Sequence, residues 1–430
     1  MLNPKDTLQV SEYDRITNDR LLKDLTSLYV KDGKWSRFLK VQNSVAYFKH
    51  YVGTVRTGHF TVSILPKVWA KDDQIQESAL KNLLRILLYT YLTPSFFEPD
   101  TLISPKHERN DLFELLIFFY SITLEKEMTQ GMYRRYVRRD EISRYLRGKL
   151  NLSKQLNRLD KSLFEITDFR FSSDNELNRY FAYATSLFSR FTQDLRNLDL
   201  LESIELIFQS EAIESHTIPV PVSFNRLNDR FQIPYNYADL IIRHMRPEPG
   251  NGKQAMMMLF DMNILFQEFF VKFIKKNKLI IFPDCTVKIE PQYKNKNFIF
   301  NKSGALRLTI PDLWIEVQRE NHKKTFILDT KYKIMQDLTI EESSENSDED
   351  VYSITSHDLY QAFTYSELYK PNGTILVFPG KKNQLSQPYN FKKDGLTLWF
   401  CMLRLDFNKD VWEKEMAEEF RGIFNKIASF

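Results

Sequence analysis

The chain has 430 residues and a mass of 51.3 kDa, which exceeds one ordinary hydrophobic core, so we expect two or three domains. Hydrophobic residues at 43% and charged residues at 27% exclude general disorder, and two cysteines exclude a disulfide framework or a four-thiolate zinc site. Sixty basic and 56 acidic residues leave a net charge of +4, which permits binding to a polyanion without requiring it.

The N-terminus and the apolar runs of the sequence show neither a secretory signal nor a membrane span. The N-terminus lacks both an apolar core and a small-residue cleavage site, so no secretory signal is visible. The longest apolar stretch, residues 112–124, is interrupted by Glu114 and is shorter than the roughly 20 residues of a membrane span. We therefore expect a cytoplasmic protein without a membrane segment.

The first part of the chain has a β-strand pattern. Between about residues 41 and 69 the sequence alternates and is rich in Val, Tyr, Phe and Ile. The step Arg56-Thr57-Gly58 separates residues 51–55 from 60–65 and suits a hairpin turn. We expect a β-rich N-terminal domain over residues 1–75.

The middle of the chain, residues 76–246, has a helical pattern. Apolar residues recur at spacings of three and four, among them Leu80, Leu83, Leu84, Leu87 and Leu88. Within this region, residues 132–149 hold seven basic residues and three tyrosines. This segment either binds phosphates or an acidic protein surface, or is a solvated helical face whose side-chain stems cover the core.

A Pro- and Gly-rich linker, residues 243–252, predicts a new unit over residues 255–430. It is expected to open with an amphipathic helix over residues 255–277. Residues 341–350 contain six acidic residues, three serines and no hydrophobic residue, which predicts a flexible insertion. A helix is expected over residues 356–369, and strands are expected over residues 279–282, 298–300, 306–310, 313–317, 325–330, 374–378 and 396–405. The fold class is thus a multidomain α+β protein whose last domain is α/β.

One motif in the last domain carries chemistry: Pro311-Asp312 followed by Asp329-Thr330-Lys331 fits the PD-(D/E)xK pattern of metal-dependent nucleases. On a strand, Asp329 and Lys331 share a face. A turn near residues 320 and 321 places Asp312 opposite Asp329 within a residue or two. Two such carboxylates suit Mg²⁺, and a neighbouring lysine suits the charge that develops on phosphate. The short motif also occurs by chance, as a solvated strand edge.

Three further residues extend this candidate site. Glu268 lies at the edge of the apolar stripe of the preceding helix, where it either reaches the same metal or is an ordinary boundary residue. Gln361 and Tyr365 stand four apart on the predicted helix and share a face, either for contact with nucleic acid or metal-bound water, or as a polar helix flank. The QxxxY arrangement after a DxK strand resembles the RecB-like branch of this nuclease superfamily.

The order of these motifs along nearly the whole chain resembles McrC, the nuclease subunit of McrBC modification-dependent and LlaJI-type restriction systems. The residues that carry the resemblance are Tyr51 to Val55, Ile64 to Lys67, Gly131 with Tyr133, Arg147-Gly148, Asp174-Asn175, Asn178-Arg179, Met262-Asn263, Leu265-Phe266, the IPD and LDTKYK segments, and DLYQAFTY. In this pattern Gln267 stands where the helix acid is expected, with Glu268 one residue later. The separation of Asp312 from Asp329 is also long, which lengthens the hairpin.

The resemblance implies Mg²⁺-dependent cleavage of double-stranded DNA by Asp312, Asp329, Lys331, Gln361 and Tyr365, with a McrB-like AAA+ GTPase hexamer as partner. Residues 1–246 are then expected to dock on the ring and stimulate its GTP hydrolysis. The GTP belongs to the partner, since the sequence contains no GxxxxGK[ST] motif. Pairing of two complexes for double-strand cleavage is left open. The alternatives are a non-cleaving adaptor that activates an AAA+ partner, and an autonomous sequence-specific nuclease.

Overall fold

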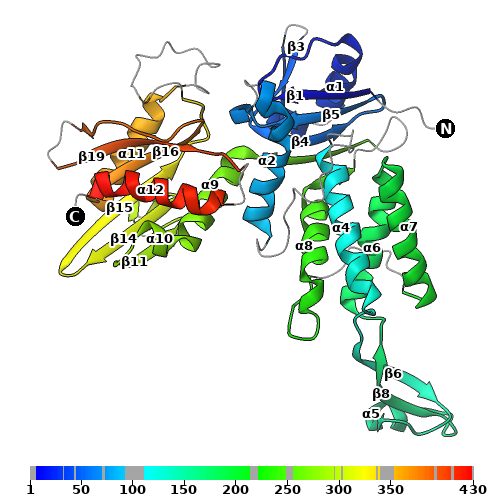
Figure 1. The fold of residues 1–430 in the computed structure, drawn as a ribbon. Helices are drawn as coiled ribbons and strands as arrows, with labels where there is room; N and C mark the ends of the chain where they lie inside the picture. Colours follow the sequence, from blue (N-terminus) through cyan, green and yellow to red (C-terminus); the bar gives the residue numbers. More distant parts are fainter. Residues whose placement is uncertain are drawn as a thin grey trace. The chain divides into compact units, whose positions relative to one another are not determined.

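The computed structural model forms two compact units, between which the chain passes repeatedly (Figure 1). Unit 1 comprises Met1–Gly53, His59–His107 and Leu259–Phe430, and unit 2 comprises Thr54–Gly58 and Glu108–Met258. The predicted acidic insertion, 341–350, and residues 248–252 of the predicted linker lie outside the described residues. The described residues are 6–31, 33–42, 45–69, 73–92, 111–213, 221–247, 255–294, 296–301, 304–335, 338, 353–391, 395–407 and 411–428.

The N-terminal part of unit 1 is rich in strands, as predicted. Strand β1 pairs in parallel with β5, and β2 pairs with β3 as an antiparallel hairpin. All six residues of β5 are buried, as expected of a strand that is covered on both faces of the sheet. The elements are β1 (Asp6–Ser11), α1 (Asp19–Lys31), η1 (Gly33–Arg37), β2 (Leu39–Gln42), β3 (Val45–Phe48), β4 (Tyr51–Arg56), β5 (Phe60–Leu65), η2 (Lys67–Trp69) and α2 (Asp73–Tyr91).

The C-terminal part of unit 1 is built on a mixed sheet with the order β11-β14-β15-β16-β19-β17, and β18 pairs with β19. Strands β15, β16 and β19 are parallel, and helix α11 connects β15 to β16. The bounds are α9 (Met262–Lys276), α10 (Lys278–Ile281), β11 (Thr286–Pro291), β12 (Lys296–Asn301), β13 (Gly304–Thr309), β14 (Leu313–Arg319), β15 (His322–Thr330), α11 (Ser356–Tyr369), β16 (Gly373–Gly380), β17 (Gln384–Leu385), β18 (Tyr389–Asn390), β19 (Thr397–Arg404) and α12 (Trp412–Ala428).

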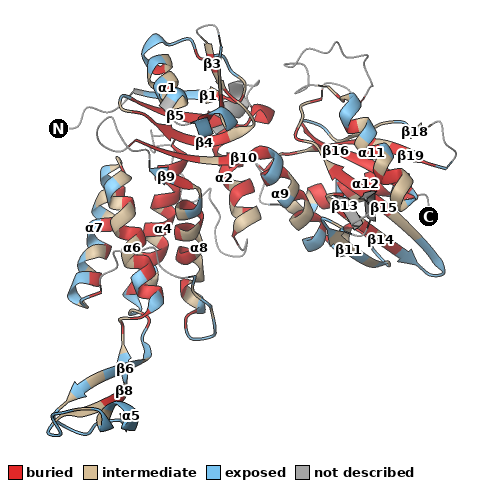
Figure 2. Ribbon diagram, turned by 180° about the vertical axis from the view of Figure 1, so that it is seen from behind, coloured by how far each residue is buried: buried red, intermediate tan, exposed pale blue. Residues whose placement is uncertain are grey.

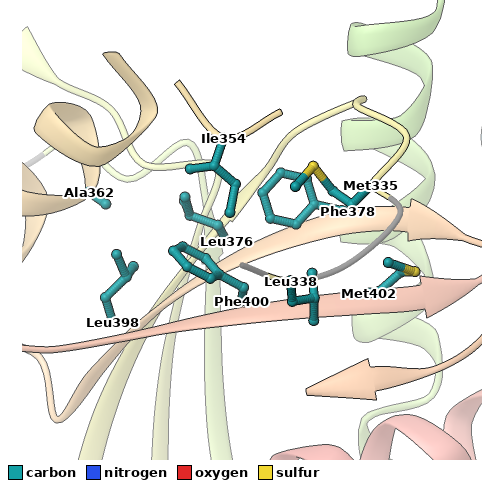
Figure 3. Packing of buried hydrophobic residues seen from close by; sticks show 9 residues of the cluster. All are labelled: Met335, Leu338, Ile354, Ala362, Leu376, Phe378, Leu398, Phe400 and Met402. Carbon is teal, nitrogen blue, oxygen red and sulfur yellow. The ribbon is translucent and has the colours of Figure 1, made fainter. Parts of the chain in front are cut away.

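Apolar side chains cover both faces of this sheet. On one face, Ala362 of α11 packs with Leu376, Phe378, Phe400 and neighbouring residues (Figure 3). On the other face, Phe424 of α12 packs on Phe326 of β15, with 4.8 Å between the ring centroids. Helix α9 packs on α12 through Phe270, whose ring contacts that of Phe420. The two predicted strands 374–378 and 396–405 and the predicted helix 356–369 are confirmed. Residues 279–282 form helix α10 instead of a strand, and the predicted helix 255–277 begins only at Met262, after strand β10 (Met256–Asp261).

Hydrogen bonds connect the N-terminal and C-terminal parts of unit 1. The Trp69 indole donates to the carbonyl of Leu405 at 3.0 Å, and the Tyr89 hydroxyl donates to Glu413 at 2.7 Å. Residues 1–75 and 255–430, predicted as separate domains, are therefore grouped largely into one compact unit. The sequence pattern could not show this, because contacts between distant segments leave no local periodicity.

Unit 2 is a helical bundle in which α4 packs against α7 and α8, and α6 packs against α7. At one end of the bundle, where α4 begins, the Arg56 guanidinium, 1% exposed, lies 2.5 Å from Asp111 and 2.7 Å from Glu114. Glu114 also accepts hydrogen bonds from Thr192 and Asn197, so the buried charges are paired. The bounds are α4 (Leu112–Thr129), α6 (Glu176–Phe191), α7 (Leu195–Ser210), η4 (Asp229–Phe231), α8 (Gln232–His244) and β9 (Met245–Pro247).

Between α4 and α6 the chain forms an antiparallel β structure, which we call the finger. It consists of β6 (Arg135–Ser143), β7 (Lys149–Leu150), α5 (Leu152–Leu156) and β8 (Phe164–Ser172). Residues 132–149, predicted as helical, thus supply two of its strands, which corrects that prediction. The finger has almost no core, since only Ile166 and Thr167 are buried between residues 135 and 172 (Figure 2). Because both faces of the finger are exposed to solvent, its strands lack the alternation of apolar and polar residues that marks a half-buried strand. Within the part of the chain that the structure describes, no helix is long and apolar enough to cross a membrane.

Candidate active site

The β14–β15 hairpin brings the two predicted aspartates together. Its turn lies at residues 320 and 321, as predicted, with Arg319 opposite His322 and Leu313 opposite Leu328. Continued by one step, this register sets Asp312 opposite Asp329 at the open end of the hairpin. Asp329 shares the sheet face of its β16 neighbour Leu376, so it lies at the border of the apolar cluster beneath α11.

Both carboxylate oxygens of Asp312 are held by hydrogen bonds. Gln267 Nε2 on α9 donates to Oδ1 at 2.5 Å. The backbone N and the hydroxyl of Thr330 donate to Oδ2 at 2.8 and 2.5 Å. Burial nevertheless raises the pKa of Asp312 above its usual value, against these hydrogen bonds and the nearby Lys331 charge.

Asp329 is almost completely buried, with 2% of its surface exposed. Its Oδ2 lies 2.7 Å from Lys331 Nζ as an ion pair, and no other donor among the described residues reaches this oxygen. Burial, with the neighbouring Asp312 charge, raises the pKa of Asp329 to about 7, and Lys331 lowers it only in part. Since the single Lys331 charge stands beside two largely buried carboxylates, a bound divalent cation would lower the remaining cost of burying them.

Lys331 begins a chain of hydrogen bonds that ends on the backbone. Its ammonium donates to Gln361 Oε1 at 2.7 Å, and Gln361 Nε2 donates to the Tyr365 hydroxyl at 2.7 Å. Tyr365 in turn donates to the carbonyl of Ile310 at 3.1 Å. The two helix residues predicted from their spacing thus contact each other, and Gln361 also contacts the lysine of the motif.

The structure does not bring Glu268 to this cluster. Its side chain is exposed and hydrogen-bonds with Tyr91, and it is the preceding residue, Gln267, that contacts Asp312. The expectation that Glu268 reaches the metal therefore does not fit this geometry, because adjacent helix positions point about 100° apart. Gln267 and Thr330 are contacts that the motif analysis did not assign. For the contact of Gln267 with Asp312, the sequence offered one indication, the position of Gln267 in the family pattern. It offered none for the contact of Thr330.

The donor set suits one hard cation. Asp312 and Asp329 offer carboxylate oxygens with lone pairs left over, and Asp329 Oδ2 is buried with only the Lys331 ammonium beside it among the described residues. The described residues contain no group of three or more His, Cys, Asp or Glu that could hold a metal. Mg²⁺ is compatible with such a site, because it commonly takes one or two carboxylates and fills its other positions with water and phosphate oxygens.

Comparisons with known proteins agree with the predicted resemblance. Residues 46–379 match the family model of the McrBC 5-methylcytosine restriction system component. A refined half-complex from a tetradecameric assembly of Thermococcus gammatolerans McrB AAA+ hexamers with bound McrC contains a chain 21% identical, with a TM-score of 0.66 over 98% of this chain and 100% of that chain. The Thermococcus gammatolerans McrBC complex contains one 22% identical, with a TM-score of 0.48 over 63% of this chain and 88% of that chain.

At these identities the first structure is evidence for a shared fold. No curated protein matches. The family match spans well over half of the sequence and includes the hairpin with Asp312 and Asp329. This chain belongs to the family of McrBC 5-methylcytosine restriction system components, as its resemblance to McrC predicted.

Proposed function

We propose that the chain is the Mg²⁺-dependent DNA endonuclease subunit of a McrBC-like restriction system, with a PD-(D/E)xK nuclease domain at its C-terminus. The observation that carries this proposal is the register of the β14–β15 hairpin. It joins Asp312 and Asp329 at one end of the sheet with Lys331 beside them. Family membership supplies the restriction context.

Each side chain has a distinct role in this proposal. Asp312 and Asp329 would hold Mg²⁺, which when bound polarises the phosphate and lowers the pKa of a coordinated water. Lys331 carries a positive charge beside the aspartates, where it is placed to offset the charge that builds up on the phosphate oxygens. Gln361 and Tyr365 keep the lysine ammonium in place through their hydrogen bonds. Gln267 and Thr330 fix the rotamer of Asp312.

We further propose that unit 2 docks on a McrB-like AAA+ GTPase ring through the finger. Tyr136, Phe169 and Phe171 are 60 to 70% exposed on its strands, and an exposed apolar surface of this kind marks a protein interface. Residues of the family pattern hold its base. The side-chain amides of Asn175 and Asn178 donate to the carbonyl of Tyr133, before β6, at 3.0 and 2.8 Å. They also donate to the carbonyl of Ser173, after β8.

The exposed arginines of the finger fit an acidic partner surface as well as phosphate. Arg138, for example, is 62% exposed and bonded only weakly to Asp140. We favour the protein partner, because exposed aromatic side chains alternate with the charged ones on this surface. A surface that binds only phosphate would be expected to be purely basic. Loss of DNA binding without loss of GTPase stimulation in finger variants would favour phosphate instead.

The alternative of a non-cleaving adaptor is less favoured, because all three residues of the motif are present, with Asp312 opposite Asp329 in the hairpin register and Lys331 paired with Asp329. The deciding test is DNA cleavage by the full chain with its McrB-like partner, GTP and Mg²⁺. Asp312→Ala and Lys331→Ala are expected to abolish cleavage while GTP hydrolysis by the partner stays stimulated. Wild-type stimulation without any cleavage would establish the adaptor. Cleavage without the partner would establish an autonomous nuclease.

A further inference from the structure

Directly after Lys331 the chain enters a second group of buried polar side chains. Tyr332 is 4% exposed, and its hydroxyl donates a 2.8 Å hydrogen bond to Oε2 of Glu12. The same oxygen accepts a 3.0 Å hydrogen bond from the backbone N of Lys67. Glu12 and Lys67 are themselves 2% and 5% exposed. We call Glu12, Lys67 and Tyr332 the Glu12 cluster; all three belong to unit 1.

The charges of the Glu12 cluster are shut off from water. The Lys67 ammonium lies 4.9 Å from the ring centroids of both Tyr13 and Tyr332. Burial raises the pKa of Glu12 to about 7 and lowers that of Lys67 to about 8, although each charge favours the other. Because desolvation offsets this attraction, such a pair adds little net stability, whereas the direction of its hydrogen bonds constrains geometry.

Three successive residues here bind three different parts of the molecule. Lys331 donates from its backbone N to Val377 on β16 at 2.8 Å, while its ammonium reaches Asp329 and Gln361. Tyr332 binds Glu12, which lies 320 positions earlier in the chain. Lys333 lies 2.6 Å from Asp358 in the first turn of α11. Since β15 ends at Thr330, these side-chain contacts take over from the ladder of sheet hydrogen bonds in holding the segment.

We propose that Tyr332 is a positioning residue for Lys331, anchored by Glu12, so that the N-terminal segment sets the geometry of the candidate active site. The kinetic consequence rests on the proposed nuclease function, whereas the structural consequence does not. A shift of the segment after β1 reaches Lys331 through one hydrogen bond and one peptide link. The N-terminal region is thereby connected to the candidate active site.

The test compares two tyrosines that each donate to a glutamate across unit 1. Tyr332→Phe removes the hydroxyl that binds Glu12. Tyr89→Phe, the matched control, removes the 2.7 Å hydrogen bond to Glu413 at a residue that is also 4% exposed. Hydrogen exchange of the full chain is followed at the peptide containing Lys331, whose amide is bonded to Val377. Exchange there should accelerate about tenfold or more in Tyr332→Phe and stay unchanged in Tyr89→Phe.

Cleavage by the assembled complex supplies the second readout. In Tyr332→Phe, kcat should fall about tenfold or more with KM for DNA within about twofold, since small misplacements of a catalytic group act on the chemical step. Glu12→Ala should reproduce both effects. Glu12→Gln, which keeps an oxygen acceptor for the hydroxyl, should restore most of the activity and the slow exchange. If Tyr332→Phe fails to fold, the Ala and Gln variants of Glu12 decide.

The outcomes separate this inference from the proposed function. Wild-type exchange and kcat in Tyr332→Phe, or equal acceleration in Tyr89→Phe, would overturn the positioning role even if the wild-type complex cuts DNA. Conversely, a wild-type complex that does not cut DNA would refute the nuclease function. A selective change in hydrogen exchange at Lys331 would still support its anchoring by Tyr332. A Glu12→Gln variant as impaired as Glu12→Ala would also refute the positioning role of Tyr332, since the charge of Glu12 and not its hydrogen bond would then matter.

Discussion

Asp329→Asn should abolish cleavage and yet stabilise the metal-free protein. The substitution keeps the shape of the side chain and removes a negative charge that is 2% exposed and lies close to Asp312. In the metal-free protein that charge is unfavourable, because burial and the nearby Asp312 charge outweigh the ion pair with Lys331. The substitution should therefore raise the stability of the metal-free protein while it abolishes DNA cleavage.

The magnitude follows from the pKa of Asp329. Burial beside Asp312 raises this pKa from 3.8 to about 7, and about three units correspond to about 4 kcal/mol at 1.36 kcal/mol each. This pKa already includes the favourable charge of Lys331, but Asn brings a buried NH₂ group that needs an acceptor of its own, so the net gain at pH 8 should be about 1 to 3 kcal/mol. The unfolded carboxyl deprotonates first, so between about pH 4 and 7 the folded state binds more protons. The stability of the wild type therefore falls as pH rises across that window.

Thermal unfolding of the full chain in EDTA measures this effect. The variant should melt only slightly above the wild type at pH 5, where the wild type has lost the smaller part of this stability, and several degrees above it at pH 8, at about 2 to 4 °C per kcal/mol. Mg²⁺ at 100 times its dissociation constant should stabilise the wild type by about 2.7 kcal/mol and the variant far less.

A matched substitution of the opposite sign is the control. Asp358 is also buried, but hydrogen bonds from Lys333 and Thr355 outweigh burial and hold its pKa below the usual value. Asp358→Asn should therefore lower the melting temperature at pH 8. A variant of Asp329 that melts below the wild type at pH 8, or that gains the same stability at pH 5 as at pH 8, would refute the reasoning.

Three other predictions concern the rest of the molecule. In a denaturant titration, Arg56→Ala should lower the free energy of unfolding of unit 2 by about 3 to 5 kcal/mol, because two buried carboxylates lose their partner. Arg138→Ala, which removes an exposed ion pair, should lower it by less than about 1 kcal/mol. Gln267→Glu should bring a third acid to the site, lowering the melting temperature in EDTA and tightening Mg²⁺ binding by calorimetry; unchanged Mg²⁺ affinity would argue against a metal there. Replacing Phe169 and Phe171 by Ser should leave the melting temperature unchanged and abolish stimulation of the partner's GTPase, and full stimulation would remove the finger from the interface.

The hairpin of the site could be predicted from the sequence because its geometry is local. A turn at residues 320 and 321 and strand pairing fix which residue faces Asp329, whatever the rest of the chain does. The helix residues Gln361 and Tyr365 were found by the same kind of rule, the four-residue spacing of a helix face. Glu268 was misplaced because a helical stripe fixes a direction only to about one residue, and Gln267 lies on the side of Asp312.

The finger and the joining of the N-terminal and C-terminal regions could not be predicted in this way. The strands of the finger are exposed on both faces, so charged and aromatic residues mix without an apolar face. The bond from Tyr332 to Glu12 depends on how β1 and β15 meet, which no short motif encodes. The linker pattern near residue 250 does mark a real change, from the helices of unit 2 to β10 and the return to unit 1.

DNA cleavage by the Asp329→Asn chain, assembled with its McrB-like partner and assayed under single-turnover conditions with GTP and Mg²⁺, tests the central claim most directly. GTP turnover in the same tube reports whether the complex is intact. The proposed site predicts that cleavage is lost while GTP turnover stays at the wild-type rate. Cleavage at the wild-type rate by the variant complex would contradict the assignment of the active site.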